Sequence, residues 1–275
     1  MACLYLVATP IGNLGDISPR ALETLAAADF IAAEDTRVTR RLLMHFGIDK
    51  PVVSYYEFNK ERSGEAILAR LLAGESCALV SDAGTPAVSD PGEPLVRLCV
   101  AHGIQVTAIP GPCAAICALT LSGLDTSRFL FEGFLPTDKK RLEERLTCLT
   151  RHTCTFILYE APHRLLRTLE ALASCLGSQR RIAVCRELTK LHEEVLRLTL
   201  GEAVAHFTQR EPRGEFVLVL EGGVPAKEAP FWEAMSVQEH IAHYEQQGHT
   251  RMEAVKQTAK DRGVPKNEIY MQTLR

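Results

Sequence analysis

The residues best suited to chemistry lie in loops that are rich in glycine, proline and small polar side chains. The longest, residues 81–92, reads Ser-Asp-Ala-Gly-Thr-Pro-Ala-Val-Ser-Asp-Pro-Gly and follows an apolar run. Such a loop is longer than a strand-to-helix connection needs. It offers a carboxylate, hydroxyl groups and the backbone amides of Gly84 and Gly92, but lacks the pattern that binds triphosphates. It is therefore predicted to bind a small polar ligand with amino and carboxylate ends.

Two shorter loops have a related composition. Residues 9–16, Thr-Pro-Ile-Gly-Asn-Leu-Gly-Asp, contain two glycines that would let a ligand approach the backbone, although alone this segment is better explained as a plain crossover turn. The glycine spacing is not the dinucleotide-binding fingerprint, which disfavours a dinucleotide fold. Residues 109–115, Ile-Pro-Gly-Pro-Cys-Ala-Ala, predict a rigid turn into a helix of small side chains, which suits either a flat ligand ring or tight helix packing.

The elements that must position these loops alternate between short apolar runs and helical patterns over residues 1–124. This alternation predicts an α/β domain with a mainly parallel sheet. Ligands bind beyond the carboxyl ends of such strands, where the three loops fall. The expected strands are Leu4–Ala8, Phe30–Ala33, Val52–Tyr56, Cys77–Val80 and Val106–Ile109, with helices over 18–28, 36–46 and 65–72 among those between them.

Residues 125–223 predict a second α/β domain, in which consecutive strands follow one another without an intervening helix. We therefore expect a mixed sheet rather than a copy of the first domain. The expected strands are Phe129–Leu135, Thr153–Tyr159, Ile182–Arg186, Val195–Leu200 and Phe216–Leu220, and the expected helices are Lys139–Thr150 and Pro162–Leu176.

A Gly- and Pro-containing linker over residues 222–230 leads to a small helical module at 231–275. Two capping boxes begin at Ser236 and Thr250, and a Gly-Val-Pro turn at 263–265 precedes a last helix over 266–274, which together predict a helix-turn-helix pattern. From residue 249 onward there are six lysines and arginines against three acids, although the whole chain has a net charge of −3. A nucleic-acid contact and a solvated helix face explain this basic balance equally well.

The composition excludes several classes of protein. Of 275 residues, 46% are hydrophobic and 24% charged, which is ordinary for a globular chain and excludes a disordered one. No apolar run is long enough to span a membrane, and the first residues do not form a signal peptide. Nine cysteines without a Cys-x-x-Cys pair indicate neither disulfides nor a metal site, so we expect a cytoplasmic protein without bound metal.

Taken together, the loop motifs resemble the tetrapyrrole-methylase superfamily. Two strings are typical of its ribosomal branch, the 16S rRNA cytidine-2′-O-methyltransferases: Glu34-Asp35-Thr36-Arg37 and Glu160-Ala161-Pro162-His163-Arg164. The other matching segments are residues 9–16, Ser81-Asp82-Ala83-Gly84-Thr85-Pro86, Ile109-Pro110-Gly111-Pro112 and Arg186-Glu187-Leu188-Thr189-Lys190.

The resemblance implies a class III methyltransferase with two α/β domains of the tetrapyrrole-methylase type, followed by a small C-terminal helical module. It also implies a homodimer that binds S-adenosylmethionine between its domains and acts on 16S rRNA in the small ribosomal subunit. Cys113 stands where this family often has Ser or Thr, so a backbone contact is expected there. The implied cofactor contacts are Pro10, Ser81, Asp82, Ala83, Gly84, Thr85, Val88, Cys113, Ala114, Tyr159, Glu160, Thr189, Gly214 and Glu215.

Methylation of a ribose hydroxyl would benefit from a proton acceptor, because the hydroxyl is a poor nucleophile. Lys190 suits this role only if its surroundings lower its pKa. Arg37 and Arg164 are expected to hold the RNA backbone, since arginine does not lose its proton. The candidate acceptors are Glu34, Asp35, Glu160, His163, Glu187 and Lys190.

Simpler structural roles remain open for several of these residues. Glu34, Asp35 and His163 also suit helix starts, and Glu187 also suits an ion pair with Arg186. Two other functions remain open as well, a tetrapyrrole C-methyltransferase of the precorrin type and a non-catalytic RNA-binding regulator.

Overall fold

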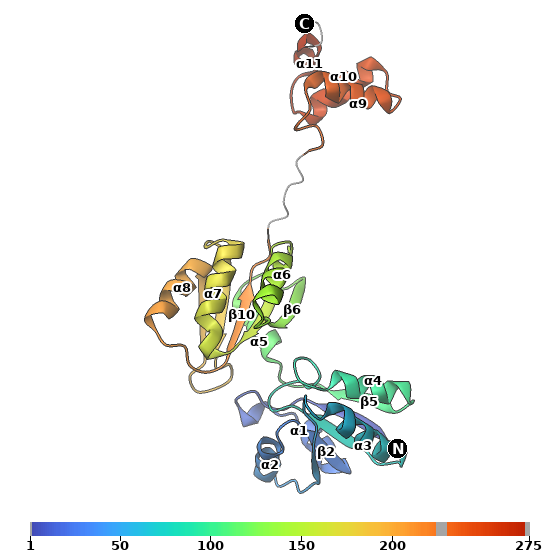
Figure 1. Ribbon diagram of the computed structural model, residues 1–275, viewed down its shortest axis with the longest axis vertical. Helices are drawn as coiled ribbons and strands as arrows, with labels where there is room; N and C mark the ends of the chain where they lie inside the picture. Colours follow the sequence, from blue (N-terminus) through green and yellow to red (C-terminus); the bar gives the residue numbers. More distant parts are fainter. Residues whose placement is uncertain (1, 224–229, 273–275) are drawn as a thin grey trace. The chain divides into compact units, whose positions relative to one another are not determined.

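The computed structural model describes residues 2–223 and 230–272; residues 1, 224–229 and 273–275 lie outside the description. The chain divides into two compact units, residues 1–223 and 224–275 (Figure 1). Both predicted α/β domains belong to the first unit, so the boundary between residues 124 and 125 stays a prediction. Most of the predicted linker, 224–229, and the end of the predicted last helix, 273–274, fall outside the described residues.

The first sheet is entirely parallel, as the sequence predicts, with strand order β3-β2-β4-β1-β5. Its strands are β1 (Cys3–Val7), β2 (Phe30–Ala33), β3 (Val52–Ser54), β4 (Cys77–Val80) and β5 (Gln105–Ile109). The connecting elements are a 3₁₀ turn at Leu14–Asp16 and helices α1 (Pro19–Ala27), α2 (Thr36–His45), α3 (Lys60–Leu72) and α4 (Glu93–Ala101).

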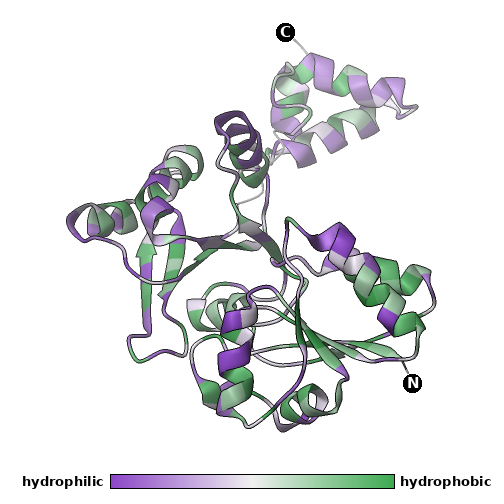
Figure 2. Ribbon diagram, turned by 60° about the horizontal axis from the view of Figure 1, so that its bottom comes forward, coloured by the Kyte–Doolittle hydropathy of each residue, from purple (hydrophilic) through white to green (hydrophobic). Residues whose placement is uncertain are grey.

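Helices cover both faces of this sheet because alternate strand residues point to opposite sides. On β2, Ile31 packs with α1 and α2, whereas Phe30 packs with α3 and α4. In Figure 2 the strands of this sheet are mostly green, whereas the helices around it carry both purple and green segments. Because the helices cover the faces of the sheet, the carboxyl ends of its strands are lined by loops.

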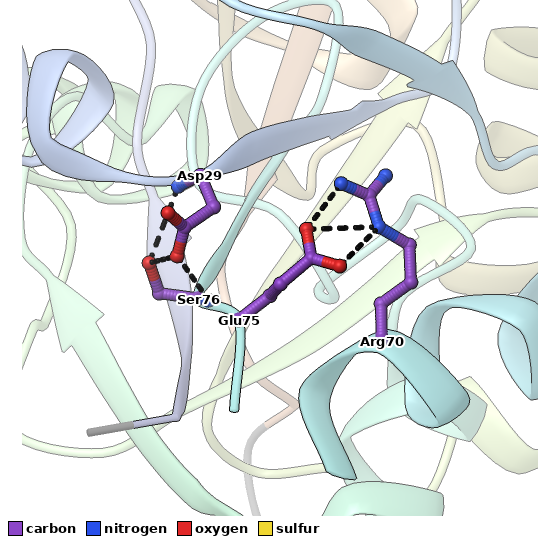
Figure 3. Close-up of polar contacts among 4 residues, drawn as sticks. All are labelled: Asp29, Arg70, Glu75 and Ser76. Atoms are coloured by element: carbon purple, nitrogen blue, oxygen red, sulfur yellow. Dashed lines mark hydrogen bonds and ion pairs between the residues drawn. The ribbon is translucent and has the colours of Figure 1, made fainter. Parts of the chain in front are cut away.

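Polar contacts tie together the opposite, amino-terminal ends of β2 and β4 (Figure 3). The Asp29 carboxylate accepts hydrogen bonds of 2.7 Å from both the backbone N–H and the hydroxyl of Ser76. Next to this pair, Arg70 of α3 donates to Glu75 and lies 3.5 Å from the centroid of the Phe30 ring. These contacts fix the strand starts at the edge away from the three loops.

The second sheet is mixed, with strand order β6-β7-β10-β8-β9, in which only β6 and β7 pair in parallel. Its strands are β6 (Phe129–Phe134), β7 (Thr155–Glu160), β8 (Arg181–Arg186), β9 (Glu194–Thr199) and β10 (Phe216–Leu220). The predicted direct succession of strands is right for β8 and β9, but wrong for β9 and β10. Helix α8 (Leu200–Gln209) separates them, and it begins in a capping box of Thr199 and Glu202 that the sequence prediction overlooked.

Helix α5 (Ala114–Ser122) connects the two sheets. It follows β5, but its small residues pack against the second sheet, where Ala118 lies beside Cys185 and Val217. The other face of that sheet is covered by α6 (Lys139–Leu149), α7 (Pro162–Leu176) and α8, as Figure 1 shows. Because α5 follows the first sheet along the chain and packs on the second, the loop that starts it lies where the two sheets meet.

The second unit contains α9 (Val237–Gln246), α10 (Arg251–Asp261) and α11 (Lys266–Gln272). Both predicted capping boxes are confirmed, since Ser236 and Thr250 each accept from the backbone of the glutamate three residues later. Ile241, Val255 and Ile269 form the apolar core between the helices. A turn at Gly263, with φ of +67°, separates α10 from α11, and the interpretation of this pair as a helix-turn-helix element stays a prediction.

Candidate active site

A cavity of about 440 Å³ lies where the loops of the first sheet meet the second sheet. It is predominantly apolar, with carboxylates concentrated on the side formed by the first sheet. The residues lining it are Ile11, Glu34, Asp82, Ala83, Gly84, Thr85, Val88, Ser89, Asp90, Cys113, Ala114, Phe134, Tyr159, Glu160, Ala161, Pro162, Leu188, Glu215, Phe216 and Val217.

The loop after β4 is held in place by the other two loops. Thr9 and Gly84 exchange backbone hydrogen bonds of 2.9 and 3.0 Å, and the Thr85 hydroxyl donates to the carbonyl of Pro112 over 3.0 Å. Gly84 has a φ of +85°, and a Cβ there would lie 3.2 Å from Ile11, so glycine is required at this turn. Ser81 is buried and hydrogen-bonds within the loop, which makes it a support for the cavity wall rather than part of its lining.

Three carboxylates give this side of the cavity a negative potential. Burial raises the pKa of Glu34, and the neighbouring Asp90 and Asp82 raise it further. Burial also raises the pKa of Asp90, with a smaller contribution from Asp82. Asp82 accepts a 3.0 Å hydrogen bond from the backbone N–H of Asp35, which fixes its position. Such a group of carboxylates favours a ligand that carries positive charge.

An aromatic wall faces these carboxylates from the second sheet. The Tyr159 hydroxyl accepts a 3.1 Å hydrogen bond from the backbone N–H of Ala115, in the first turn of α5. Its ring meets those of Phe131 and Phe134 edge to face, with centroids 5.1 and 5.7 Å apart, and burial raises the pKa of Tyr159 to about 12. This wall provides the apolar surface on which a flat ring can pack.

Glu160 lines the cavity, but its carboxylate is already occupied. One oxygen accepts from the backbone N–H of Ala161 at 2.9 Å and the other from the Thr168 hydroxyl, while Arg164 lies 3.4 Å away. Arg164 also donates to the carbonyl of Leu135 over 2.8 Å. These groups secure the start of α7, and His163 is exposed outside the cavity lining. Because both oxygens of Glu160 already accept hydrogen bonds, the structure argues against the predicted role of Glu160 as proton acceptor. Because Arg164 is engaged with Glu160 and Leu135, it also argues against the predicted role of Arg164 in holding the RNA backbone.

Glu187 and Lys190 form a junction beside the cavity. The Lys190 ammonium lies 2.9 Å from Glu187 and 2.9 Å from Glu215. Burial acts to lower the pKa of Lys190, but its hydrogen bonds to Glu215 and Glu187 outweigh burial and raise it. The condition stated for Lys190 as a base is therefore not met. Glu187 in turn accepts from the backbone N–H of Glu215 at 3.0 Å, which holds the two loops of the second sheet together.

At this junction Gly12 packs closely against Lys190, and Gly214 packs closely against Glu187. A Cβ on Gly12 would lie 2.4 Å from Lys190 and 2.9 Å from the Thr189 hydroxyl, and a Cβ on Gly214 would lie 2.6 Å from Glu187. Pro10, Thr189 and Gly214 are not among the lining residues, although each adjoins in the chain a residue that lines the cavity.

Asp35 and Arg37 lie at the start of α2. Asp35 caps the helix by accepting from the Arg37 backbone N–H at 2.8 Å, and its carboxylate pairs with the Arg37 guanidinium at 2.6 Å. These hydrogen bonds hold the pKa of Asp35 well below its usual range, which opposes a role as proton acceptor at neutral pH. The Arg37 side chain remains 85% exposed.

The structure thus brings together Glu34 with most of the predicted cofactor contacts: Asp82 to Thr85, Val88, Cys113, Ala114, Tyr159, Glu160 and Glu215. Sequence reasoning missed Asp90, although it belongs to the same loop, and Phe134, which carried no signal beyond its strand. The other missed lining residues are Ile11, Ser89, Ala161, Pro162, Leu188, Phe216 and Val217.

No group of three or more His, Cys, Asp or Glu side chains in ranges 2–223 and 230–272 is arranged to hold a metal ion. Among the helices of the same ranges, none is long and apolar enough to cross a membrane.

Comparison with known proteins gives consistent similarities. Residues 3–204 match the family model of tetrapyrrole (corrin/porphyrin) methylases. The chain is 48% identical over 274 residues to the ribosomal RNA small subunit methyltransferase I of Synechocystis sp., covering 100% of this chain and 98% of the relative. It is 47% identical over 273 residues to the protein of the same name from Bacillus subtilis, covering 98% and 93% of the two chains.

Solved structures share the fold at low sequence identity. The cobalt precorrin-4 methyltransferase superposes with a TM-score of 0.60 at 18% identity, covering 80% of this chain and 95% of the other. The uroporphyrin-III C-methyltransferase of Thermus thermophilus, complexed with S-adenosylhomocysteine, gives a TM-score of 0.56 at 20% identity, covering 79% and 96%. The predicted fold class is thereby confirmed.

Proposed function

Because the chain belongs to the ribosomal RNA small subunit methyltransferase I family, within the tetrapyrrole methylases, we propose that it methylates the 2′-hydroxyl of a cytidine in the decoding region of 16S rRNA. The methyl donor of this class of enzyme is S-adenosylmethionine. The observation that carries the proposal is the cavity between the two sheets, where Glu34, Asp82 and Asp90 from loops of the first sheet lie with the aromatic side chains of Phe134 and Tyr159 from the second.

The residues of this cavity fit the donor. When bound, S-adenosylmethionine supplies an electrophilic methyl group on a positively charged sulfonium. Asp82, Asp90 and Glu34 supply negative charge to balance that cation, and the tight turn at Gly84 exposes backbone groups for its polar ends. The Tyr159 wall supplies an apolar surface for the adenine ring.

Glu34 is the best placed of the six candidate proton acceptors. It lines the cavity, and within the described part of the chain its carboxylate makes no hydrogen bond. Its raised pKa makes it a stronger base than an ordinary glutamate. A bound donor would give up its methyl group to the 2′-oxygen and leave as a neutral thioether, so the protein would have to accept only the hydroxyl proton. The hydroxyl proton passes to Glu34 and from there to water.

The RNA is held at the mouth of the cavity by α2, which begins two residues after Glu34. Arg37, Arg40 and Arg41 are all exposed and lie at neighbouring positions on this helix. Guanidinium groups bind phosphate oxygens through paired hydrogen bonds, so these residues position the backbone while Glu34 meets the ribose. The main contribution of the protein to the rate is this alignment of oxygen, methyl carbon and sulfur.

The homodimer and the cytoplasmic location implied by the sequence resemblance are part of the proposal. Light scattering coupled to size-exclusion chromatography measures the first directly, and a mass equal to one chain would remove it. Fractionation of cells measures the second.

The proposal is tested by methyl transfer from labelled S-adenosylmethionine to unmodified small ribosomal subunits, protein-free 16S rRNA and a tetrapyrrole. We expect incorporation into the assembled subunit in preference to free rRNA. Incorporation into the tetrapyrrole alone would replace the proposal by a C-methyltransferase function. Binding of S-adenosylmethionine without transfer to any of the three would favour a non-catalytic regulator.

A further inference from the structure

The C-terminal unit is a folded body in which two polar side chains, His240 and Thr258, are completely buried. His240 is completely buried and stacks on Trp232, with ring centroids 5.7 Å apart. Arg262 donates to the ring nitrogen Nδ1 of His240 at 3.2 Å and to the carbonyl of Met235. This arginine is therefore an internal support of the unit, and the charges available to a partner must be found elsewhere.

The acidic side chains of the unit are largely engaged in its own structure. Glu239 and Glu253 each close a capping box, and Glu253 accepts from the Thr250 backbone N–H at 2.9 Å. Asp261 accepts from the Tyr244 hydroxyl and lies 3.3 Å from His240, while Glu245 pairs with Arg251 at 3.5 Å. Their charge is thus tied to local donors.

Three lysines of α10 and α11 stand in contrast. Lys256, Lys260 and Lys266 are exposed, and among residues 2–223 and 230–272 none of them has an ion-pair partner. Lys256 and Lys260 lie one turn apart in a row that begins at Met252, which is 62% exposed, and this row covers about 12 Å of helix. Tyr270, 49% exposed, lies one turn after Lys266 on α11.

Exposed cations on two helices that pack together, with exposed apolar side chains among them, are the combination that binds a nucleic-acid strand. Ammonium groups contact successive phosphates, and side chains such as Tyr provide surfaces for bases. We propose that this lysine face, defined as Lys256, Lys260 and Lys266 of α10 and α11, binds the phosphate backbone of ribosomal RNA outside the methylation site. The inference rests on the proposed function, because that function supplies the RNA.

The experiment uses the full chain and compares the wild type with the triple variant Lys256→Gln, Lys260→Gln, Lys266→Gln. Binding to unmodified small subunits and to protein-free 16S rRNA is titrated over a range of salt concentrations. The slope of log affinity against log salt should become shallower by about two, since three phosphate contacts on a single strand contribute roughly 0.7 each. Over a fourfold change in salt, this corresponds to about a sixteenfold difference in how strongly affinity falls.

Two controls separate charge from folding. The matched variant Lys256→Arg, Lys260→Arg, Lys266→Arg keeps the cations and should keep the wild-type slope. Binding of S-adenosylmethionine should be unchanged in both triple variants, because its cavity lies entirely among residues 11–217.

The outcomes distinguish this inference from the proposed function. An unchanged slope in the glutamine variant overturns the lysine face and leaves methylation untouched. A loss confined to assembled subunits, with unchanged binding to protein-free rRNA, assigns the surface to a ribosomal protein and also overturns it. A wild-type chain that binds rRNA without methylating it defeats the proposed function, whereas a shallower slope in the glutamine variant still supports the lysine face, since the titration needs no turnover.

Discussion

Replacing Gly12 by alanine should disturb the contact between the loop at residues 9–16 and the segment Leu188–Lys190, which forms part of the cavity wall. The new Cβ would lie 2.4 Å from Lys190 Cγ and 3.0 Å from the backbone oxygen of Leu188. Neither atom is the free end of a flexible side chain, so the loop itself must move. That loop relaxes poorly, because Glu187 and Thr189 already hold left-handed backbone with φ of 52° and 65°.

The magnitude follows from this overpacking, which typically costs about 1–3 kcal/mol of the free energy of unfolding. Leu188 lines the cavity, so its displacement should also weaken cofactor binding. We expect the affinity for S-adenosylmethionine to fall by about tenfold, which corresponds to roughly 1.4 kcal/mol.

Denaturant unfolding measures the first quantity and isothermal calorimetry the second. Gly15→Ala is the matched control, because the nearest neighbour of its Cβ is the Asn13 side chain at 3.3 Å. The control should change stability by less than about 0.5 kcal/mol. A Gly12→Ala chain with wild-type stability and wild-type affinity would refute the argument that this junction shapes the cavity.

Three further changes test other parts of the structure. Glu34→Gln should lower kcat by about 10²- to 10⁴-fold while leaving S-adenosylmethionine bound. The activity of the wild type should fall as the pH drops through the raised pKa of the Glu34 carboxyl, because the protonated group cannot accept a proton. An unchanged kcat in the variant would exclude Glu34 as the proton acceptor. Leu158→Ala, in the buried centre of β7, should cost about 2–5 kcal/mol in denaturant unfolding, and a cost below 1 kcal/mol would contradict the packing described. The hydrogen bonds from Ser76 lower the pKa of Asp29 in the folded protein. The carboxylate therefore stabilises the fold fully above its unfolded pKa of about 3.9, and this stabilisation is lost as the pH falls through the lower folded pKa. Asp29→Asn should abolish this contribution. Thermal unfolding against pH would then show a shallower acid limb in the variant, and identical limbs would contradict the assignment.

Local patterns in the sequence identified the first sheet and its loops well. The strand Phe30–Ala33 was predicted with its observed bounds, and the loop at 82–85 lines the cavity as expected. Both signals are local: an apolar run bounded by turn residues, and glycine in a loop that follows a strand. Helix α8 was missed because Gly201 in its first turn weakens the helical pattern, although Thr199 caps it.

The hydrogen-bond and ion-pair partners of the candidate side chains could not be predicted from the sequence. Glu34 directly follows β2 and Glu160 ends β7, so the sequence does not distinguish them. In the structure the Thr168 hydroxyl and the Ala161 backbone N–H donate to Glu160, whereas Glu34 lines the cavity. The raised pKa of Lys190 likewise depends on Glu215, which lies 25 residues away in the sequence and contacts Lys190 only in the folded chain. Such contacts are tertiary, and no spacing rule along the chain encodes them.

The most direct test of the central claim is the identity of the methylated nucleoside. Small subunits labelled by this protein with S-adenosylmethionine are digested to nucleosides and separated against standards. We predict that the label elutes with 2′-O-methylcytidine and disappears with Glu34→Gln. Label on a base, or on a nucleoside other than cytidine, would contradict the proposed reaction.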